Sequence, residues 1–342
     1  MKFNEISIVS TTPKPSSEII IERELSDFEF TLNDQLKEKW QRAIDNKIRL
    51  FFSRCVAGEN FVYITTVDKK SPHLLTLPNF PKSIEEMIII RFWLEKLFKC
   101  AFECACFDRN VFNPELINIL FDNDKTIPLQ FNVQEAKLSC GSVNLENSLK
   151  FFLNHLCVSE LLYIDLSYIA NTEQHLNSLF NILINEGNKF PKIYFYNSYV
   201  MKNLYDLVIK YIAESRDCSK MVPVIIFYLI TLKNLKLNER AENFETKEGK
   251  RKKYTSYQIC NPKERFVFCN KEYCNRVIFY CQIRKVKKET KIDVFKCYSP
   301  QKLRSINHTA IFICDRYEGK LNWAKIHEIS IDDVNSNKFL VN

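Results

Sequence analysis

Apolar residues recur along the chain in triplets with the spacing x, x+3, x+5, starting at residue 84. The last two positions of each triplet alternate with polar residues, which predicts a strand with one face toward a core. The triplets are Ile84/Met87/Ile89, Ala101/Cys104/Cys106, Pro128/Phe131/Val133, Leu161/Ile164/Leu166, Phe190/Ile193/Phe195 and Met221/Val224/Ile226.

Helix signals lie between these triplets. Asn113 is a good N-cap residue and Pro114 follows it at the first helical position, so a helix is expected to begin there. Asn171 with Gln174 resembles a capping box, and Gly187 stands where a C′ glycine closes a helix. Further helices are expected over residues 33–43, 149–156 and 201–213.

Repeated strand–helix units predict an α/β protein built as a leucine-rich-repeat-like solenoid. A compact α/β domain with a mostly parallel sheet is the alternative. After residue 236, alternating runs separated by turn residues predict a β-rich antiparallel cap. The expected divisions are a leader over 1–22, the repeat domain over 23–236 and the cap over 237–288.

Composition excludes several classes of function. The chain of 342 residues has only 5 glycines and contains no GxGxxG, GxxxxGK[ST] or GxSxG motif, which argues against kinase, P-loop and Rossmann chemistry. Its 13 cysteines form no CxxC pair, which is typical of reduced thiols in the cytosol or nucleus. No apolar run approaches the ~18 residues of a membrane span. We therefore expect a cytoplasmic or nuclear protein that does not enter the membrane.

Histidine and cysteine positions predict neither a catalytic nor a metal site. His155 and His175 fall in helices, where a packed or capping role is favoured over that of a base. Cys104 and Cys106 share a strand face, as core residues do. The spacing of Cys260, Cys269, Cys274 and Cys281 suits strand positions better than zinc. No cofactor and no enzymatic activity are expected.

The net charge of +8 includes two dense basic runs, at residues 250–253 and 284–288. Both are interpreted as solvated connections between strands, so nucleic-acid binding is the disfavoured alternative. A protein-binding surface is predicted instead from residues that alternate with the triplet positions and so face away from the core. These are Tyr163, Asp165, Tyr194 and Tyr196, tyrosine being a frequent interface anchor.

The two ends of the chain echo each other. Residues 1–8 read MKFNEISI and residues 324–331 read AKIHEISI, with five of the eight positions identical. Both copies are interpreted as the same strand-forming segment, and the second follows an amphipathic stretch at about 289–320.

Five stretches resemble a large family of F-box domain-containing proteins of root-knot nematodes. They are FEFTLNDQLKEKW (28–40), LPNFPKSIEEMIIIR (77–91), LFDNDKTIPLQF (120–131), LFNILINEGNK (179–189) and DCSKMV (217–222). In that family an F-box precedes the repeat domain. F-box proteins bind Skp1 and present a protein substrate to a cullin-based ubiquitin ligase.

By the same resemblance, residues 289–321 look like an F-box, followed by a tail over 322–342. The usual Leu-Pro opening is replaced by Val286-Lys287. The resemblance implies a non-catalytic substrate-recognition adaptor whose partners are a Skp1-like protein and an unknown protein substrate. The alternative is an interaction scaffold with a degenerate F-box that recruits no ligase. The residues implied to meet Skp1 are Ile292, Val294, Phe295, Leu303 and Ile306.

Overall fold

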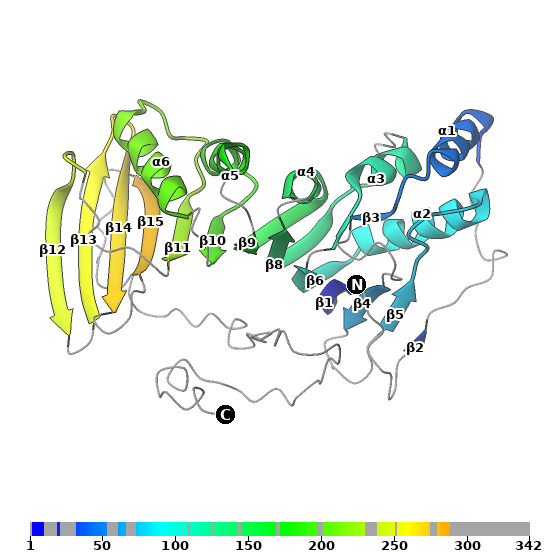
Figure 1. The fold of residues 1–342 in the computed structure, drawn as a ribbon, viewed down its shortest axis with the longest axis horizontal. Coiled ribbons are helices and arrows are strands. Elements are labelled where there is room, and N and C mark those ends of the chain that lie inside the picture. Colours follow the sequence, from blue (N-terminus) through cyan, green and yellow to red (C-terminus); the bar gives the residue numbers. More distant parts are fainter. Residues whose placement is uncertain are drawn as a thin grey trace. The chain divides into compact units, whose positions relative to one another are not determined.

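A computed structural model describes most of the chain before residue 288. The described residues are 2–9, 19–20, 32–52, 61–65, 73–108, 110–122, 124, 126–141, 145–168, 172–196, 201–229, 238–249, 252–273 and 279–287. They form a 13-stranded mixed sheet, a two-stranded sheet and six helices, so the α/β class is confirmed (Figure 1). The F-box-like segment and the tail after it lie outside the described residues.

The elements follow in mixed order along the chain. The helices are α1 (Asp34–Asp45), α2 (Ile84–Phe98), α3 (Pro114–Phe121), α4 (Leu145–His155), α5 (Glu173–Asn185) and α6 (Met201–Glu214). The strands are β1 (Lys2–Val9), β2 (Ile19–Ile20), β3 (Phe51–Phe52), β4 (Phe61–Thr65), β5 (His73–Thr76), β6 (Ala101–Asp108), β7 (Val111–Phe112), β8 (Phe131–Gly141), β9 (Leu156–Tyr168), β10 (Lys192–Tyr196), β11 (Val224–Leu229), β12 (Glu242–Gly249), β13 (Lys252–Cys260), β14 (Glu264–Tyr273) and β15 (Phe279–Lys287).

The large sheet has the order β12-β13-β14-β15-β11-β10-β9-β8-β6-β1-β4-β5-β2. Its middle, from β1 through β6, β8, β9 and β10 to β11, is parallel throughout. One helix precedes each of the strands β6, β8, β9, β10 and β11, and each step moves to the next position of the large sheet in the same direction. The described helices therefore lie on one face of the sheet (Figure 1).

The first strand, β1, lies inside the sheet between β4 and β6. The strand interpretation of residues 1–8 is thereby confirmed for the first copy of the echo. Ile6 and Ile8 are buried, so β1 supplies core side chains. The sheet thus begins at residue 2, ahead of the boundary expected at residue 23.

Helix caps follow the local sequence closely. Asn33 and Asn113 accept hydrogen bonds from backbone amides in the first turns of α1 and α3, and Pro114 opens α3 as predicted. The N-cap of α5 is Thr172, whose hydroxyl accepts from the amide of His175, and not Asn171. Asparagine and threonine can both cap a helix, and here the Thr172 hydroxyl is the cap, one position later than predicted.

Gly187 stands at the predicted C′ position of α5, directly after the C-cap, and has a second role there. The cap of α5 is Glu186, and the Gly187 amide donates to the carbonyl of Lys220 at 2.8 Å. A Cβ at this position would overlap the carbonyl oxygen of Met221. The missing side chain therefore lets the residues after α5 approach the loop after α6.

The side chains buried beneath the helices show that two of the predicted triplets, those of β6 and β11, begin one residue too early. Phe102, Ala105 and Phe107 of β6 are buried, whereas Cys104 and Cys106 face the opposite side, half-buried. The spacing x, x+3, x+5 is real here, but it begins one residue later than predicted. The triplet of β11 is shifted in the same way, to Val222/Ile225/Phe227, whereas in β8 the predicted strand positions Phe131 and Val133 are both buried and Pro128 is exposed.

Two predicted triplets are buried as expected, and one is not a strand. All members of Leu161/Ile164/Leu166 and Phe190/Ile193/Phe195 are buried. Ile84/Met87/Ile89 belongs to α2, where Ile84 and Met87 lie three residues apart on one helix face and Met87 alone of the three is fully buried. Register pairing aligns Phe107, Leu138, Ile164, Phe195 and Phe227 in one continuous row under the helices.

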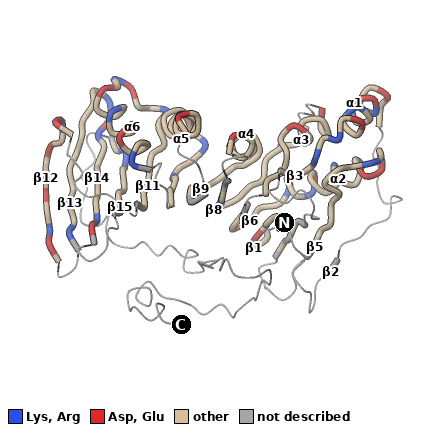
Figure 2. The backbone as a smooth tube through the Cα atoms, in the orientation of Figure 1, with Lys and Arg blue, Asp and Glu red and all other residues tan. Residues whose placement is uncertain are grey.

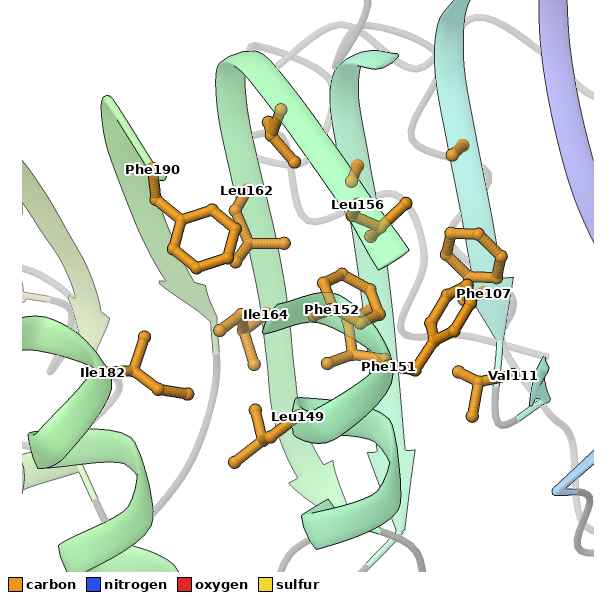
Figure 3. Packing of buried hydrophobic residues seen from close by; sticks show 14 of the residues in the cluster. Phe107, Val111, Leu149, Phe151, Phe152, Leu156, Leu162, Ile164, Ile182 and Phe190 are labelled. Carbon is orange, nitrogen blue, oxygen red and sulfur yellow. The ribbon is translucent and has the colours of Figure 1, made fainter. Parts of the chain in front are cut away.

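An aromatic cluster fills the space between α4 and the strands. Phe151 of α4 lies 5.1 Å from Phe107 and 6.0 Å from Phe131, measured between ring centroids (Figure 3). All three rings are fully buried. Large rings supply much apolar area per residue, which lets a single helix layer seal this face of the sheet.

Antiparallel strands β12 to β15 continue the same sheet beyond β11, so the predicted β-rich cap is confirmed. β15 pairs with β11, from Val224 opposite Arg284 to Leu229 opposite Phe279. We call this pairing of β11 with β15 the joint. Helix α6 covers one side of it, where the Tyr205 and Tyr257 hydroxyls lie 3.1 Å apart.

The basic run at 284–288 lies partly in β15, which corrects its interpretation as a solvated connection. The ammonium of Lys285 donates to the carbonyls of Cys218, Ser219 and Met221 at 3.2, 2.8 and 2.7 Å. Burial lowers the pKa of Lys285 below its ordinary value. Lys285 therefore fastens the loop after α6 to the cap.

Candidate functional site

The face of the parallel strands opposite the described helices, here called the open face, carries a group of tyrosines. Leu162 and Ile164 of β9 point toward α4 (Figure 3), so Tyr163 and Asp165 between them lie on the open face. In β10, Ile193 and Phe195 are buried, and Tyr194 and Tyr196 alternate with them. All four residues of the predicted binding surface therefore share the open face.

Register brings these residues together across strands. Tyr163 pairs with Tyr194, Asp165 pairs with Tyr196, and Tyr196 pairs with Tyr228 of β11. We call Tyr163, Tyr194, Tyr196 and Tyr228 the tyrosine stripe. Its ring centroids are 5.1 Å apart for Tyr163 and Tyr194 and 5.4 Å apart for Tyr196 and Tyr228, both pairs stacked. The stripe is half-buried.

Charges of both signs border the stripe. Lys137 of β8 holds its ammonium 5.6 Å from the centroid of the Tyr163 ring, within the range of a cation–π contact. Burial, and then the negative charge of Asp165, raise the pKa of Tyr163 and of Tyr196 above the ordinary value. These hydroxyls stay protonated at neutral pH, so they are suited to hydrogen bonding and poorly suited to act as bases.

Tyr228 was missed from the sequence for an identifiable reason. The predicted triplet Met221/Val224/Ile226 assigned the wrong face of β11 to the core, which concealed Tyr228. The structure buries Ile225 and Phe227 beneath the helices, and this phase would have placed Tyr228 with the other tyrosines.

Cys104 and Cys106 of β6 lie on the open face, where one strand, β8, separates them from Tyr163 of β9. Glu5 and Glu135 flank Cys104 in register on either side. Burial, followed by the charge of Glu5, raises the pKa of the Cys104 thiol, so it remains protonated and unreactive. Within the described ranges, no group of three histidine, cysteine or acidic side chains could hold a metal ion.

Histidines occupy structural positions in the part of the chain that is described. His155 is 2% exposed, and its Nδ1 lies 2.8 Å from the carbonyl oxygen of Leu129. Burial lowers its pKa, so the ring is neutral. His175 lies in the first turn of α5, where its backbone amide meets the cap. Packed and capping roles, as predicted for these two residues, fit these surroundings.

Cysteines of the cap point to opposite faces of the sheet. Cys269 pairs with Gln282 in the row that continues the open face, whereas Cys281 pairs with Phe227 on the side of α6. Both are buried. Cys260 lies in β13 near the turn into β14, and Cys274 lies outside the described residues. The three described thiols therefore occupy separate strand positions, as their spacing indicated.

A shallow groove of about 490 Å³ lies between α6 and the chain that enters β12. Asp206, Lys210, Glu214 and Arg240 line it with both signs of charge. Arg240 donates to the carbonyl of Cys260 at 2.8 Å, which stabilises the turn. Arg240 thus has a structural role. We take the tyrosine stripe as the better candidate for a binding site.

The residues implied to meet Skp1, Ile292 through Ile306, lie outside the described residues. Within the part of the chain that is described, no helix has the length and the apolar composition that a membrane span requires.

Comparisons with known proteins give limited matches. The model of a domain of unknown function, DUF8381, matches residues 21–167, a range that includes Tyr163 and Asp165 and ends before Tyr194. No curated protein matches the chain. The crystal structure of an S-adenosylmethionine-dependent methyltransferase from Clostridium acetobutylicum ATCC 824 is similar over 60% of this chain and 74% of its own, at 11% identity and a TM-score of 0.14. A similarity at that score carries no argument about fold or activity. The matched range includes α1 to α4 and the strands from β3 through most of β9, and it begins after β1 and β2.

Proposed function

We propose that this protein is a non-catalytic adaptor that binds a protein partner through the tyrosine stripe. The observation that carries the proposal is the convergence of four tyrosines and Asp165, from β9, β10 and β11, on one sheet face. Tyrosines combine a large apolar ring with a hydroxyl donor at low entropic cost, which is why they anchor many interfaces.

The chemistry of the stripe favours a partner segment with lysine or arginine. The Lys137 ammonium already lies over the Tyr163 ring, so these rings accept a cation from the sheet surface. Asp165 adds a negative charge beside Tyr163 and Tyr196, whose pKa is raised by burial and then by this charge. A basic side chain of a partner would gain both a ring face and a carboxylate.

The array of strands and helices supports a solenoid-like interpretation of the parallel region. Each unit contributes one strand, one helix and one position in the same buried rows, from Phe107 to Phe227. Repeats of this kind present a continuous strand surface to partners. The wide open face of five neighbouring parallel strands is consistent with that use.

A peptide-array experiment tests the stripe. Immobilised 15-residue peptides of graded lysine and arginine content are probed with the wild type and with Tyr194→Ala and Asp165→Asn. We expect the wild type to select basic peptides, Tyr194→Ala to bind about tenfold less and Asp165→Asn to lose the preference for charge. Tyr211→Ala, on the helix side of the sheet, is the matched control. Equal binding by all four proteins would contradict the proposal.

The second half of the proposal concerns the ligase. On the resemblance to F-box proteins, residues 289–321 recruit a Skp1-like adaptor, with Phe295 as a central contact. A pull-down with purified Skp1 compares the wild type with Phe295→Asp, and Phe244→Asp, on an exposed strand, is the control. We expect Phe295→Asp alone to lose binding. Absent or equal binding throughout would favour the scaffold alternative, in which the segment recruits no ligase.

A further inference from the structure

The strand β12 forms one edge of the 13-stranded sheet. Among the described residues it has a neighbouring strand only on the β13 side, and all of its eight residues are exposed. The amides and carbonyls that point away from β13 face outward, which makes an edge of this length a template for another strand.

The second half of β12 is regular. Pairing with β13 shifts between Glu242 and Glu245, where Asn243 has a positive φ of 51°. From Glu245 to Gly249, five consecutive residues are in register with β13. The irregularity is thus confined to the start of the strand, and the outer edge beyond it can accept a partner.

The side chains of this regular half are self-complementary. Figure 2 shows acidic and basic positions along β12. If two copies of the strand pair antiparallel with Thr246 at the centre, Glu245 of each copy lies opposite Lys247 of the other. The twofold symmetry makes this ion pair twice, on the same face of the joined sheet.

Other registers between two copies of β12 give less favourable charge pairs. Centring on Glu245 or on Lys247 places identical charges opposite each other. A shift that sets Thr246 opposite Lys247 brings Glu245 against Glu248. A shift in the other direction sets Thr246 opposite Glu245 and Lys247 opposite Phe244, so that it makes no ion pair. The charges therefore select one register, which is unusual for a strand whose edge is merely protected by charge.

We propose that β12 pairs with β12 of a second copy of this chain, in an antiparallel register centred on Thr246, and so forms a homodimer. The dimer is independent of the tyrosine stripe, which belongs to strands in the middle of the sheet. Because only residues 245–247 of each copy pair within the regular half, the interface is small, and association is expected to be weak, concentration-dependent and sensitive to salt.

Sedimentation velocity over about two decades of concentration around the micromolar range tests the proposal. The wild type is expected to shift from monomer to dimer. Glu245→Lys and Lys247→Glu each place like charges opposite each other twice, and each should weaken dimerisation about tenfold or more. An equimolar mixture of the two variants restores opposite charges across the interface and should form heterodimers.

The double variant Glu245→Lys with Lys247→Glu supplies the matched control, because it reverses both charges and should dimerise as the wild type does. Circular dichroism melting of each variant checks that the exposed substitutions leave the fold intact. A wild type that stays monomeric throughout would overturn the proposal. So would single variants that dimerise as tightly as the wild type, or a mixture that gains no dimer.

Discussion

Neighbouring strands of the parallel region are separated along the chain by a helix, whereas neighbouring strands of the cap follow one another through short connections. β9 ends at Tyr168 and β10 begins at Lys192, after α5, but β13 ends at Cys260 and β14 begins at Glu264. The parallel region therefore depends on helices packed over its strands, and the cap depends on local hairpins fastened at one joint. Damage to the core should unfold the first region, while damage to the joint should release the second.

The largest effect is expected in the parallel region. Phe151→Ala removes a buried ring that contacts Phe107, Phe112 and Phe131, and should lower the free energy of unfolding by about 3–5 kcal/mol. Urea denaturation followed by circular dichroism measures it. Phe244→Ala, at 53% exposure, is the control and should change stability by less than about 0.5 kcal/mol. Similar losses in both variants would contradict the packing described here.

The joint is tested by Gly187→Ala. The new Cβ would displace the backbone at Met221 and lower the free energy of unfolding by about 1–3 kcal/mol. Hydrogen exchange should rise in β11 and β15, since the Val222 amide donates to the carbonyl of Leu183 beside this contact. Asn188→Ala, on an exposed neighbour, should leave exchange unchanged. Faster hydrogen exchange in α1 and β1, with none in β11 and β15, would contradict a contact between Gly187 and Met221 that supports the joint.

Lys285→Met should weaken the same joint, and should lower the free energy of unfolding by less than Gly187→Ala does. It leaves three carbonyls without their shared ammonium donor, at a cost of about 1–2 kcal/mol, because these groups can partly rehydrate. Chemical denaturation gives the value. The comparison is Lys263→Met, whose exposed ion pair with Asp217 should contribute little. A larger loss from Lys263→Met would reverse the order of the two contacts.

The smallest effect should appear only at alkaline pH, within the cap. Burial raises the pKa of Tyr205 and Tyr257 above the ordinary value of 10.0. Above pH 10 the unfolded chain loses these protons while the folded chain keeps them, so stability falls as pH rises. Tyr257→Phe should show a shallower loss in melting temperature between pH about 9 and about 11. An identical slope in both proteins would mean that the buried pair makes no alkaline contribution.

Local features were predictable because their causes are local. Asn113 with Pro114 specifies a helix start through one side-chain oxygen and one fixed φ angle, and the structure has the helix there. The turn at Asn261-Pro262 between β13 and β14 was predictable for the same reason, whereas Asn270, Lys271 and Glu272, also expected to form a turn, belong to β14. The alternation of Tyr194 and Tyr196 with Ile193 and Phe195 likewise gave the correct faces of β10.

Face assignment failed where both sides of a strand carry apolar or small residues. In β6, Cys104 and Cys106 are as compatible with a core as Ala105 and Phe107, and the same ambiguity in β11 concealed Tyr228. A period of two leaves two choices of phase, and the packing of a helix on one side decides between them. No pattern within β1 indicated that it would lie between β4 and β6.

The sequence by itself determined the alternation of strands and helices, most of the helix starts and the residues able to build a tyrosine surface. The tertiary structure decided which strands are neighbours, which face the helices cover and which edge stays accessible at β12. These choices depend on how distant segments fill a shared core, because burying the rings around Phe151 requires one particular order of strands. Local propensity carries no information about that order.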